Sequence, residues 1–560
     1  MKKAKIFPYV LAAIVALLVF GLSLYLFCPA LNVHNVGLWI LVDVVFLVFL
    51  VVLKLAKGRG ASSWVTTEWN VDAKGRSKKT IKLRPGFFIA PFVLAALILI
   101  LSIIGSTFFN ATAYSKILTV TESDFSTDLS ESVGTDSIAL MDTASAQMLG
   151  DREIGALSDV VSQFDVSDAY TQIDFSGKPV KVAPLEYAGF FKWINNRSSG
   201  IKGYVSVNPV TMSASFQKSE GMKYVPSAFF SEDACRYLWS KYPTLMLDNL
   251  HFEIDESGKP YYVASIIEKS IGLFGGTTVS GCVVLDPVSG ETEKYDAASI
   301  PQWVDVVFYG DLICTQYNWH GMYQNGFWNS VFAKKGCKQV TSYYSGTEET
   351  EEDTTPISDY GYVAKDGDIW IYTGITSVNG DSSNIGFLLA NERTGESRYY
   401  PIAGADEKSA MAAAEGEVQE KGYRASFPSL INIDGFPTYI MVLKDSGGLV
   451  KLYAAVNVEQ YNIVTTAATQ ADCIQANKAA LGIDRDETVD ETKEKTITIA
   501  SIKYIDIEGN TYIYFIDTEN GIFKAKASAN EEMLLLKEGD QIQISYSGNT
   551  IAQWAKTGNP

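Results

Sequence analysis

Three long apolar runs near the N-terminus constrain this chain more than any other feature of its sequence. They cover residues Ile6–Phe27, Val36–Leu53 and Phe87–Phe109. Each run is long enough to cross a hydrocarbon core of about 30 Å at about 1.5 Å per helical residue. The first run is long for a secretory signal, has no small-residue cleavage site and is followed by another span. We therefore expect a membrane anchor of three transmembrane helices over residues 1–110.

The distribution of charge predicts how this anchor is oriented. Residues 1–109 hold 12 Lys and Arg against three acidic residues, mostly before the first run or between the second and third. Cytoplasmic segments carry such an excess of cations, so the N-terminus and the loop 54–86 are expected in the cytoplasm. The same cations could also bind anionic lipid headgroups. The remaining residues carry 34 Lys and Arg against 61 Asp and Glu, which fits a solvated extracytoplasmic region.

Composition limits the function of the whole chain. The 560 residues have a formal net charge of −18 and a pI near 4.8, which excludes nucleic acid as a partner because its recognition needs a basic surface. A hydrophobic content of 47% excludes a largely disordered chain. The length predicts several domains rather than one.

Internal repeats organise the external region. Ile173–Val182 and Ile254–Val263 share the pattern Ile-Asp-x-Ser-Gly-Lys-Pro, with a shorter copy at Ile433–Ile440 and a looser one at Ile505–Ile513. Each places strand residues on both sides of an Asp- and Gly-containing turn, which predicts a β-hairpin.

A second repeat follows the hairpins. Gly281–Tyr295 matches Gly386–Tyr400 at a constant offset of 105 positions, and Tyr204–Thr211 is a partial copy. We interpret Asp286 and Asn391, which begin the two turns, as turn residues, because a calcium loop needs a denser set of carboxylates.

Helical segments precede the hairpins at Thr143–Phe164, Ser231–Lys241 and Asp406–Lys421, so a helix followed by roughly four antiparallel strands occurs three times. This order, with its closing Asp-Pro-Val-Ser-Gly-Glu turn, resembles the PepSY module of bacterial envelope proteins, most clearly over residues 231–304. The resemblance implies protein interaction and restraint of partner proteins rather than catalysis. The layout also resembles a group of Gram-positive (Firmicutes-type) multi-pass membrane proteins, which supplies a setting but no activity.

The expected fold class is α+β, with three transmembrane helices followed by tandem helix-plus-antiparallel-sheet, PepSY-like modules and a small C-terminal β-barrel. Acidic segments at Ser345–Pro356 and Asp484–Lys495 are interpreted as linkers. The expected domains are the anchor (1–110), a first PepSY-like module (111–225), a second with an aromatic segment (226–345), an acidic linker with a strand-rich segment and a third α+β module (346–481), and an OB-like or SH3-like barrel (496–560).

The chain offers little material for metal or thiol chemistry. It has three His and six Cys, and no Cys-x-x-Cys, His-Glu-x-x-His or EF-hand spacing. We therefore assign no catalytic residue, no cofactor and no metal site. Cys235 and Cys282 are expected to pack in cores, and a disulfide between Cys314 and Cys337 remains open.

One aromatic stretch, Tyr317–Trp328, is the candidate binding surface. Rings mixed with amides could form a groove for a glycan or a peptide; alternatively, they anchor an irregular segment onto the core. The candidate residues are Tyr317, Trp319, His320, Tyr323, Phe327 and Trp328.

Two other features have a functional and a structural interpretation. Asp43 lies inside the second apolar run, where a carboxylate is a candidate functional residue because burying its charge is costly; alternatively, it is neutral or paired with a neighbouring helix. The Gly-rich segment Gly272–Gly276 is interpreted as a hairpin tip, whose Leu273 and Phe274 could touch the bilayer or a partner.

These observations favour a multi-pass cell-membrane protein that is a non-enzymatic scaffold for envelope-protein or cell-wall contacts, with its large C-terminal region extracytoplasmic. One alternative is an accessory or sensor subunit of a membrane complex that signals through the spans and Asp43. The other is a cell-envelope hydrolase, favoured only if a cleft gathers carboxylates around His320.

Overall fold

The structure of the chain is a computed structural model that falls into two compact units, Met1–Ala480 and Leu481–Pro560, each described here by itself. The predicted linker 345–356 and most of the second linker, 484–495, lie outside the described residues. The described residues are 3–57, 65–71, 77–83, 89–129, 140–157, 162–341, 360–378, 383–483, 493–507, 510–519, 521–526, 531–547 and 550–556.

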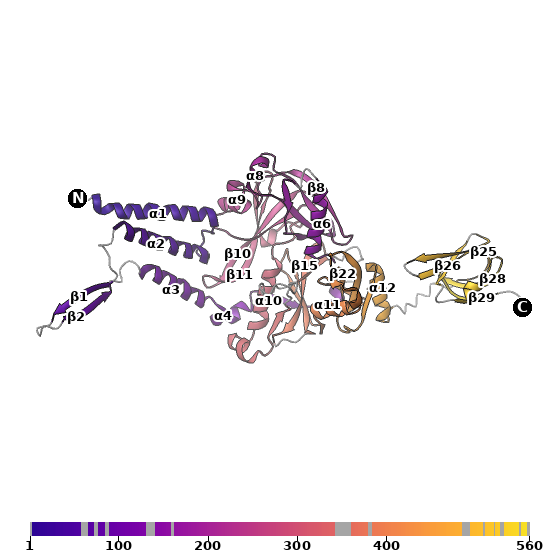
Figure 1. Cartoon of the computed structure of the whole chain (residues 1–560). Coiled ribbons are helices and arrows are strands. Elements are labelled where there is room, and N and C mark those ends of the chain that lie inside the picture. The colour runs from indigo at the N-terminus through magenta and orange to yellow at the C-terminus, as the bar shows by residue number, and fades with distance from the viewer. Residues whose placement is uncertain are drawn as a thin grey trace. The chain divides into compact units, whose positions relative to one another are not determined.

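Three apolar helices that are long enough to span a membrane open the first unit, as the sequence predicts. They lie side by side in Figure 1. The third span runs over Ile89–Tyr114 rather than 87–109 and is interrupted at Gly105–Ser106. The helices are α1 (Lys3–Phe27), α2 (Val36–Lys57), α3 (Ile89–Ile104) and α4 (Thr107–Tyr114); the α2–α3 connection contains the antiparallel strands β1 (Val65–Val71) and β2 (Ser77–Leu83).

Residues 140–222 form a helix and an antiparallel sheet in which β4 and β5 pair with two halves of β6. Asp142 caps α6 by accepting a hydrogen bond from Ser145 N, but the helix ends at Gly155 instead of reaching Phe164, which begins β4. The elements are α6 (Thr143–Gly155), β4 (Phe164–Val166), β5 (Thr171–Phe175), β6 (Lys178–Tyr187), α8 (Phe190–Asn196), β7 (Ile201–Asn208) and β8 (Ser213–Met222).

The next segment is a helix followed by a four-stranded antiparallel sheet of order β12-β11-β10-β9. The helix begins after Asp233, whose carboxylate accepts from Arg236 N, and not after Ser231. Its elements are a 3₁₀ turn (Phe230–Glu232), α9 (Ala234–Lys241), β9 (Met246–Ile254), β10 (Pro260–Ile271), β11 (Gly275–Leu285), β12 (Thr292–Asp296) and a 3₁₀ turn (Ala297–Ser299).

These two segments share one hydrophobic core. The Tyr204 ring of β7 lies 5.5 Å from the Phe252 ring of β9, and the Tyr204 hydroxyl donates to Gly258 O at 2.9 Å. Alternation along the strands explains this arrangement, since Val180 and Val182 face the core and the residue between them does not. We call residues 140–222 the first module and residues 230–299 the second module.

The strand-rich segment forms a sheet of order β13-β15-β17-β18-β3, with β14 also paired to β15. Its edge strand β3 comes directly after the third span and pairs in parallel with β18, where Val120 lies opposite Ser397. The elements are β3 (Val120–Glu122), α5 (Phe125–Asp128), α10 (Gly310–Tyr323), a π-helix (Asn329–Ala333), β13 (Lys338–Val340), β14 (Gly361–Lys365), β15 (Asp368–Ser377), β17 (Gly386–Asn391) and β18 (Ser397–Tyr400).

A further helix and antiparallel sheet complete the first unit and share a core with the strand-rich sheet. The Phe387 and Tyr439 rings, one from each sheet, lie 5.9 Å apart. The elements are β16 (Ser383–Asn384), β19 (Gly404–Ala405), α11 (Glu407–Gly416), a 3₁₀ turn (Gln419–Lys421), β20 (Arg424–Ala425), β21 (Ser429–Ile433), β22 (Phe436–Lys444), β23 (Val450–Asn457), β24 (Val464–Ala467) and α12 (Gln470–Ala480).

The repeated sequences form hairpins with matching turn chemistry. Asp286 Oδ1 accepts from the N–H groups of residues 288 and 289, and Asn391 Oδ1 accepts from those of residues 393 and 394. Gly290 and Gly395 close the two turns with φ of 77° and 75°, a conformation that favours glycine. These contacts place Asp286 and Asn391 in turns, as interpreted from the sequence.

The second unit contains five strands that pair as a closed barrel of order β25-β26-β27-β29-β28. Ile513, Phe515 and Ile544 are fully buried in its core. The elements are β25 (Lys493–Ile507), β26 (Asn510–Asp517), β27 (Ile522–Lys526), a 3₁₀ turn (Glu531–Leu535), β28 (Gln541–Ser547) and β29 (Thr550–Lys556).

Candidate functional site

The second module is hydrogen-bonded to the turn that joins α1 and α2. Trp239 Nε1 donates to Pro29 O at 2.9 Å, and Leu31 N donates to Pro243 O at 2.6 Å. Arg236 donates from Nε to the carbonyl oxygen at the end of α1, with its guanidinium 4.5 Å from the Tyr25 ring centre. Backbone and side-chain bonds together therefore fix helix α9 and the residues after it to the end of α1 and to the α1–α2 turn.

The tip of the β10–β11 hairpin contacts the anchor at two places, the α1–α2 turn and the break between α3 and α4. His34 Nδ1 lies 2.8 Å from Leu273 O, so the tip touches the α1–α2 turn. On its other side, a Cβ added at Gly275 would come within 2.2 Å of Gly105 O, which means that only glycine fits this approach. The Tyr114 hydroxyl donates to the same Gly105 oxygen at 2.7 Å. The Gly-rich tip thus packs against the chain's own membrane helices.

A cavity of about 610 Å³ lies between the α1–α2 turn and the second module. Cys235 lines it and is exposed, so its expected position in a core is wrong, whereas Cys282 is fully buried as expected. Cys314 and Cys337 are free thiols, so the structure contains no disulfide between them. Apolar side chains of the second module and of residues 27–36 form most of the wall. Its polar or thiol-bearing residues are Cys28, His34, Asn35, Cys235, Asp248, Asn249 and Lys269.

The first half of the aromatic stretch belongs to helix α10 and is not an irregular segment. Tyr317 is buried in a core, and the Trp319 ring packs edge-on against Tyr114 at 4.8 Å. His320 Nδ1 lies 3.0 Å from Ser115 O. A cavity of about 170 Å³ lies beside His320, and Glu122 contributes a carboxylate to its wall.

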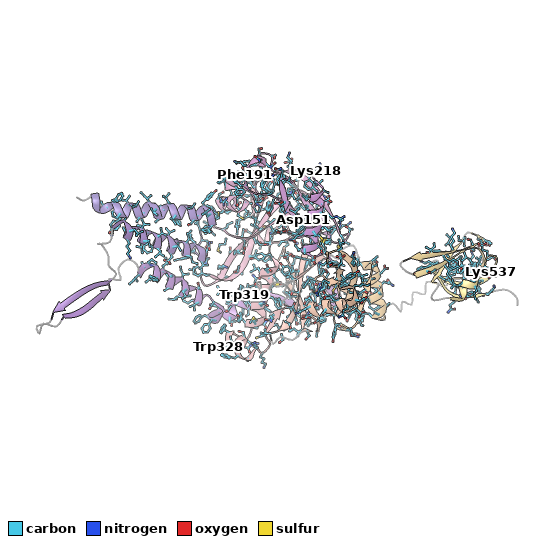
Figure 2. All side chains as sticks on the ribbon, viewed as in Figure 1. Asp151, Phe191, Lys218, Trp319, Trp328 and Lys537 are labelled. Atoms are coloured by element: carbon cyan, nitrogen blue, oxygen red, sulfur yellow. The ribbon has the colours of Figure 1, made fainter. Side chains whose placement is uncertain are left out.

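The second half of the stretch packs against the end of the third membrane helix. The Phe327 and Trp328 rings lie 5.0 Å and 5.6 Å from the Phe108 ring, and Tyr323 stacks on Phe327. Trp328 is 60% exposed, and Figure 2 shows it with Trp319 on the side of the molecule from which the helices extend. Exposed rings at the end of a span are typical of the aromatic belts that lie at membrane–water interfaces. The six candidate residues are therefore divided between a core, a small cavity and this belt-like surface.

Asp43 lies within α2, and its Oδ1 atom is buried without a hydrogen-bond partner among the described residues. Pairing with a neighbouring helix, one form of the expected alternative, is thus not found in the described part of the chain; the other form, a neutral Asp43, stays a prediction. A carboxylate oxygen without a partner in a membrane helix is costly, so Asp43 remains a candidate functional residue.

An exposed aromatic cluster lies on α8, although the repeats and membrane spans of the sequence do not predict it. Phe191 is 78% exposed and Ile194 is 47% exposed, while Phe230 extends the cluster from the second module at 55% exposure. Trp193 is buried beneath it, and its Nε1 donates to Glu232 at 3.0 Å. Several large apolar side chains exposed together mark interaction sites more often than single ones do. The Phe-Phe-Lys-Trp sequence was the available signal.

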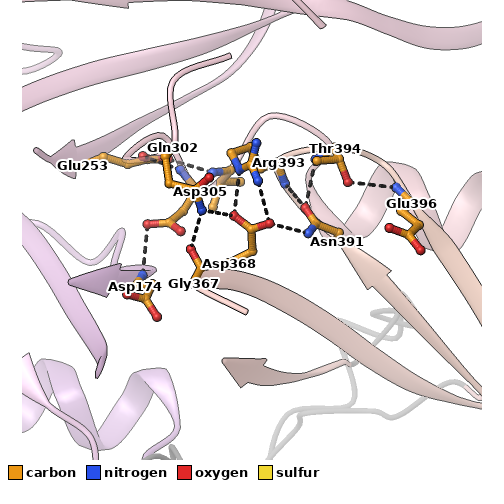
Figure 3. Close-up of polar contacts among 11 residues, drawn as sticks. Asp174, Glu253, Gln302, Asp305, Gly367, Asp368, Asn391, Arg393, Thr394 and Glu396 are labelled. Atoms are coloured by element: carbon orange, nitrogen blue, oxygen red, sulfur yellow. Dashed lines mark hydrogen bonds and ion pairs between the residues drawn. The ribbon is translucent and has the colours of Figure 1, made fainter. Parts of the chain in front are cut away.

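A buried polar junction joins the two modules to the strand-rich sheet (Figure 3). Glu253, which is fully buried, accepts from the backbone N–H groups of Asp305 and Val306 at 2.9 Å each. Asp305 in turn accepts from Asp174 N at 3.0 Å. Burial, with the nearby Glu253 carboxylate, holds the pKa of Asp305 well above its usual range.

The other half of the junction is an ion pair. Arg393 donates from Nε and from one terminal nitrogen to the two oxygens of Asp368, each at 2.7 Å, and Asn391 also donates to Asp368 at 2.7 Å. Gln302 reaches the same carboxylate at 3.1 Å from the loop after the second module. Nothing in the sequence spacing of these residues indicates that they meet.

Glu392 is a fully buried carboxyl next to this junction. Its Oε1 accepts from Gly310 N at 3.0 Å, while its Oε2 is buried without a partner among the described residues. Burial raises the pKa of Glu392 to about 8 against the opposing hydrogen bond. Among the described residues, no group of three or more His, Cys, Asp or Glu is placed to hold a metal ion.

No family model and no curated protein matches this chain. Among solved structures, an apocarotenoid oxygenase mutant from Synechocystis is 8% identical, covers 55% of this chain and has a TM-score of 0.17. The match spans 63% of that oxygenase. Levansucrase mutants from B. megaterium and Bacillus subtilis are 9% and 8% identical, with TM-scores of 0.19 and 0.18; they cover 81% and 74% of this chain, and 99% and 95% of their own. At these TM-scores the likeness carries neither a fold nor an activity to this chain.

Proposed function

We propose that this chain is a membrane-anchored scaffold of the cell envelope that binds envelope proteins or cell-wall polymer and is not an enzyme. In this proposal the N-terminus is cytoplasmic, and the PepSY-like modules and the OB-like or SH3-like barrel are extracytoplasmic. The supporting observation is the exposed cluster of Phe191, Ile194 and Phe230, carried by a module pair that shares one core. That pair is in turn hydrogen-bonded through α9 to the end of α1 and to the α1–α2 turn.

Site-specific photo-cross-linking in living cells tests the proposal. A photoreactive phenylalanine analogue at Phe191 should cross-link to an envelope protein or to wall polymer. The matched control is the same analogue at Lys218, an exposed residue of β8 on the same module. Both positions are labelled in Figure 2. Absence of a specific product at Phe191, or the same products at both positions, would contradict the scaffold.

The orientation is tested separately by labelling intact cells with a membrane-impermeant maleimide. Lys218→Cys should react from outside, whereas Lys79→Cys in the loop between the second and third spans should react only after lysis. The background is a variant in which the six native cysteines are replaced. Labelling of Lys79→Cys in intact cells would reverse the proposed topology.

A second candidate function is that of a sensor or accessory subunit, and the 610 Å³ cavity favours it. A ligand there would touch the α1–α2 turn and the second module together, so binding would act on the membrane helices directly. Under this function, Asp43→Leu should change the set of proteins that co-purify with the chain, because Asp43 has an unpartnered oxygen in α2. An unchanged set would remove this candidate.

A further inference from the structure

Lys181 is a charged side chain in an unusual position for a lysine. It lies on β6 between Val180 and Val182, on the sheet face opposite to the core of the first module, and it is only 2% exposed. Lysine is almost never fully buried unless its ammonium is paired. Among the described residues, no hydrogen-bond acceptor or carboxylate pairs with Lys181 Nζ, which lies 5.1 Å from the centre of the Tyr362 ring.

Two carboxyl groups, those of Asp142 and Glu392, act electrostatically on Lys181, but neither pairs with its ammonium. Asp142 forms an ion pair with Lys444 and caps α6. Glu392 is held by Gly310 N and, with its raised pKa, is protonated at neutral pH. A buried ammonium without a hydrogen-bonded anion is costly. The ionised carboxylate in the cavity wall, Asp142, is shared with Lys444, so the Lys181 ammonium keeps unsatisfied donors. Burial accordingly lowers the pKa of Lys181 to about 8.

Lys181 lines a cavity of about 380 Å³. The cavity lies between the first module, the strand-rich sheet and the sheet formed by strands β20–β24. The first two residues of α6, Thr143 and Ala144, also line it, and no described acceptor takes up their backbone N–H groups. The start of a helix favours negative charge for this reason. Much of the rest of the wall is aromatic or apolar, from Met141, Tyr360, Tyr362, Met411, Phe427 and Pro428.

We propose that this cavity binds a small organic carboxylate with an aromatic or aliphatic body. The carboxylate would accept hydrogen bonds from Lys181 Nζ and from the first amides of α6, and the body would pack on the Tyr362 and Phe427 side of the cavity. The volume lies within the range of small-molecule sites, about 300–1,000 Å³. The inference goes beyond the scaffold function and does not depend on it, because the cavity is separate from the α8 cluster.

The test uses the full chain in nanodiscs and fluorine NMR of 4-fluorobenzoate. We expect saturable binding to the wild type, no binding of neutral 4-fluorobenzamide, and at least about tenfold weaker binding to Lys181→Met, since a charged hydrogen bond is lost. Lys202→Met, an exposed position on the neighbouring strand β7, is the matched control and should bind normally.

Two results with the benzoate would overturn the inference: no binding of 4-fluorobenzoate to the wild type, or equal affinity of the wild type and Lys181→Met. Equal binding of the benzamide would also overturn it, and this comparison needs no variant. If Lys181→Met does not fold, protection of the wild-type Lys181 from chemical acetylation tests the site instead. Fluorobenzoate should slow acetylation of Lys181 by an N-hydroxysuccinimide ester at least about threefold while Lys202 reacts unchanged, and equal protection of both lysines would refute the site.

Discussion

Replacing Glu392 by Gln tests whether this buried carboxyl is neutral in the folded chain. Gln keeps an acceptor for Gly310 N and has a similar volume, but it cannot ionise. Glu392 has a pKa of about 8 in the folded chain against an ordinary value of 4.5. Because the folded-state pKa is raised, the stability linked to Glu392 is complete below pH 4.5 and is lost as the pH rises toward 8.

The magnitude follows from these two pKa values. Ionisation of the unfolded chain lowers the free energy of unfolding by about 3 kcal/mol at pH 7 and by about 1 kcal/mol at pH 5. Glu392→Gln removes this term, so its stability relative to the wild type should be about 2 kcal/mol higher at pH 7 than at pH 5. The change in relative stability between pH 5 and pH 7 is diagnostic, because any cost of burying the Gln amide is the same at both pH values.

Hydrogen exchange followed by mass spectrometry measures this effect on the full chain in nanodiscs. The peptides to follow cover β15 and β17, since Glu392 N donates to Ile369 O at 3.0 Å. Comparing variant with wild type at each pH removes the intrinsic pH dependence of exchange. Glu420→Gln, at an exposed position, is the control and should show no effect. A gain that is equal at both pH values, or larger at pH 5, would refute a neutral Glu392.

Three further predictions follow from single contacts. Trp239→Phe keeps an aromatic ring but loses the hydrogen bond to Pro29 O. Packing of the second module on the α1–α2 turn should weaken by about 1 kcal/mol, and hydrogen exchange in residues 29–35 should become faster. Unchanged exchange would mean that this bond does not hold the module. Asp368→Asn breaks the ion pair with Arg393. Urea unfolding should show that the free energy of unfolding of the strand-rich sheet falls by about 3–5 kcal/mol. A loss under about 1 kcal/mol would contradict a buried ion pair. Phe515→Ala should cost about 3–5 kcal/mol, seen as faster exchange in residues 493–556, with residues 1–480 as the internal control; faster exchange in both units would contradict their independence.

Local patterns in the sequence were sufficient for the membrane helices and the hairpins. A membrane span depends on hydropathy over about twenty residues, and a tight turn depends on Asp followed by Gly. In both cases the residues that determine the element lie within the element itself. The errors occurred at element ends, where one side chain decides. Asp233 caps α9 in place of Ser231, and α6 stops at Gly155.

The candidate site could not be predicted in the same way, because its contacts join residues that are distant in the sequence. Trp319 and Trp328 were selected by composition, but their role at the end of the third span depends on Tyr114 and Phe108, more than 200 positions earlier. Lys181 appears in the sequence as an ordinary lysine within a strand. Its burial arises only when the strand-rich sheet covers the outer face of the first module.

The pairing of β3 with β18 sets a short tether between the membrane and the strand-rich sheet. Only residues 115–119 separate the end of the third span from β3. At a maximum of about 3.6 Å per residue, the sheet cannot move farther than about 20 Å from that span without giving up its edge strand. During synthesis, β3 also precedes its partner by more than 270 residues, so this edge stays unpaired until β18 has been made. A delay in the synthesis or folding of β18 would therefore leave β3 as a free three-residue segment next to the third span.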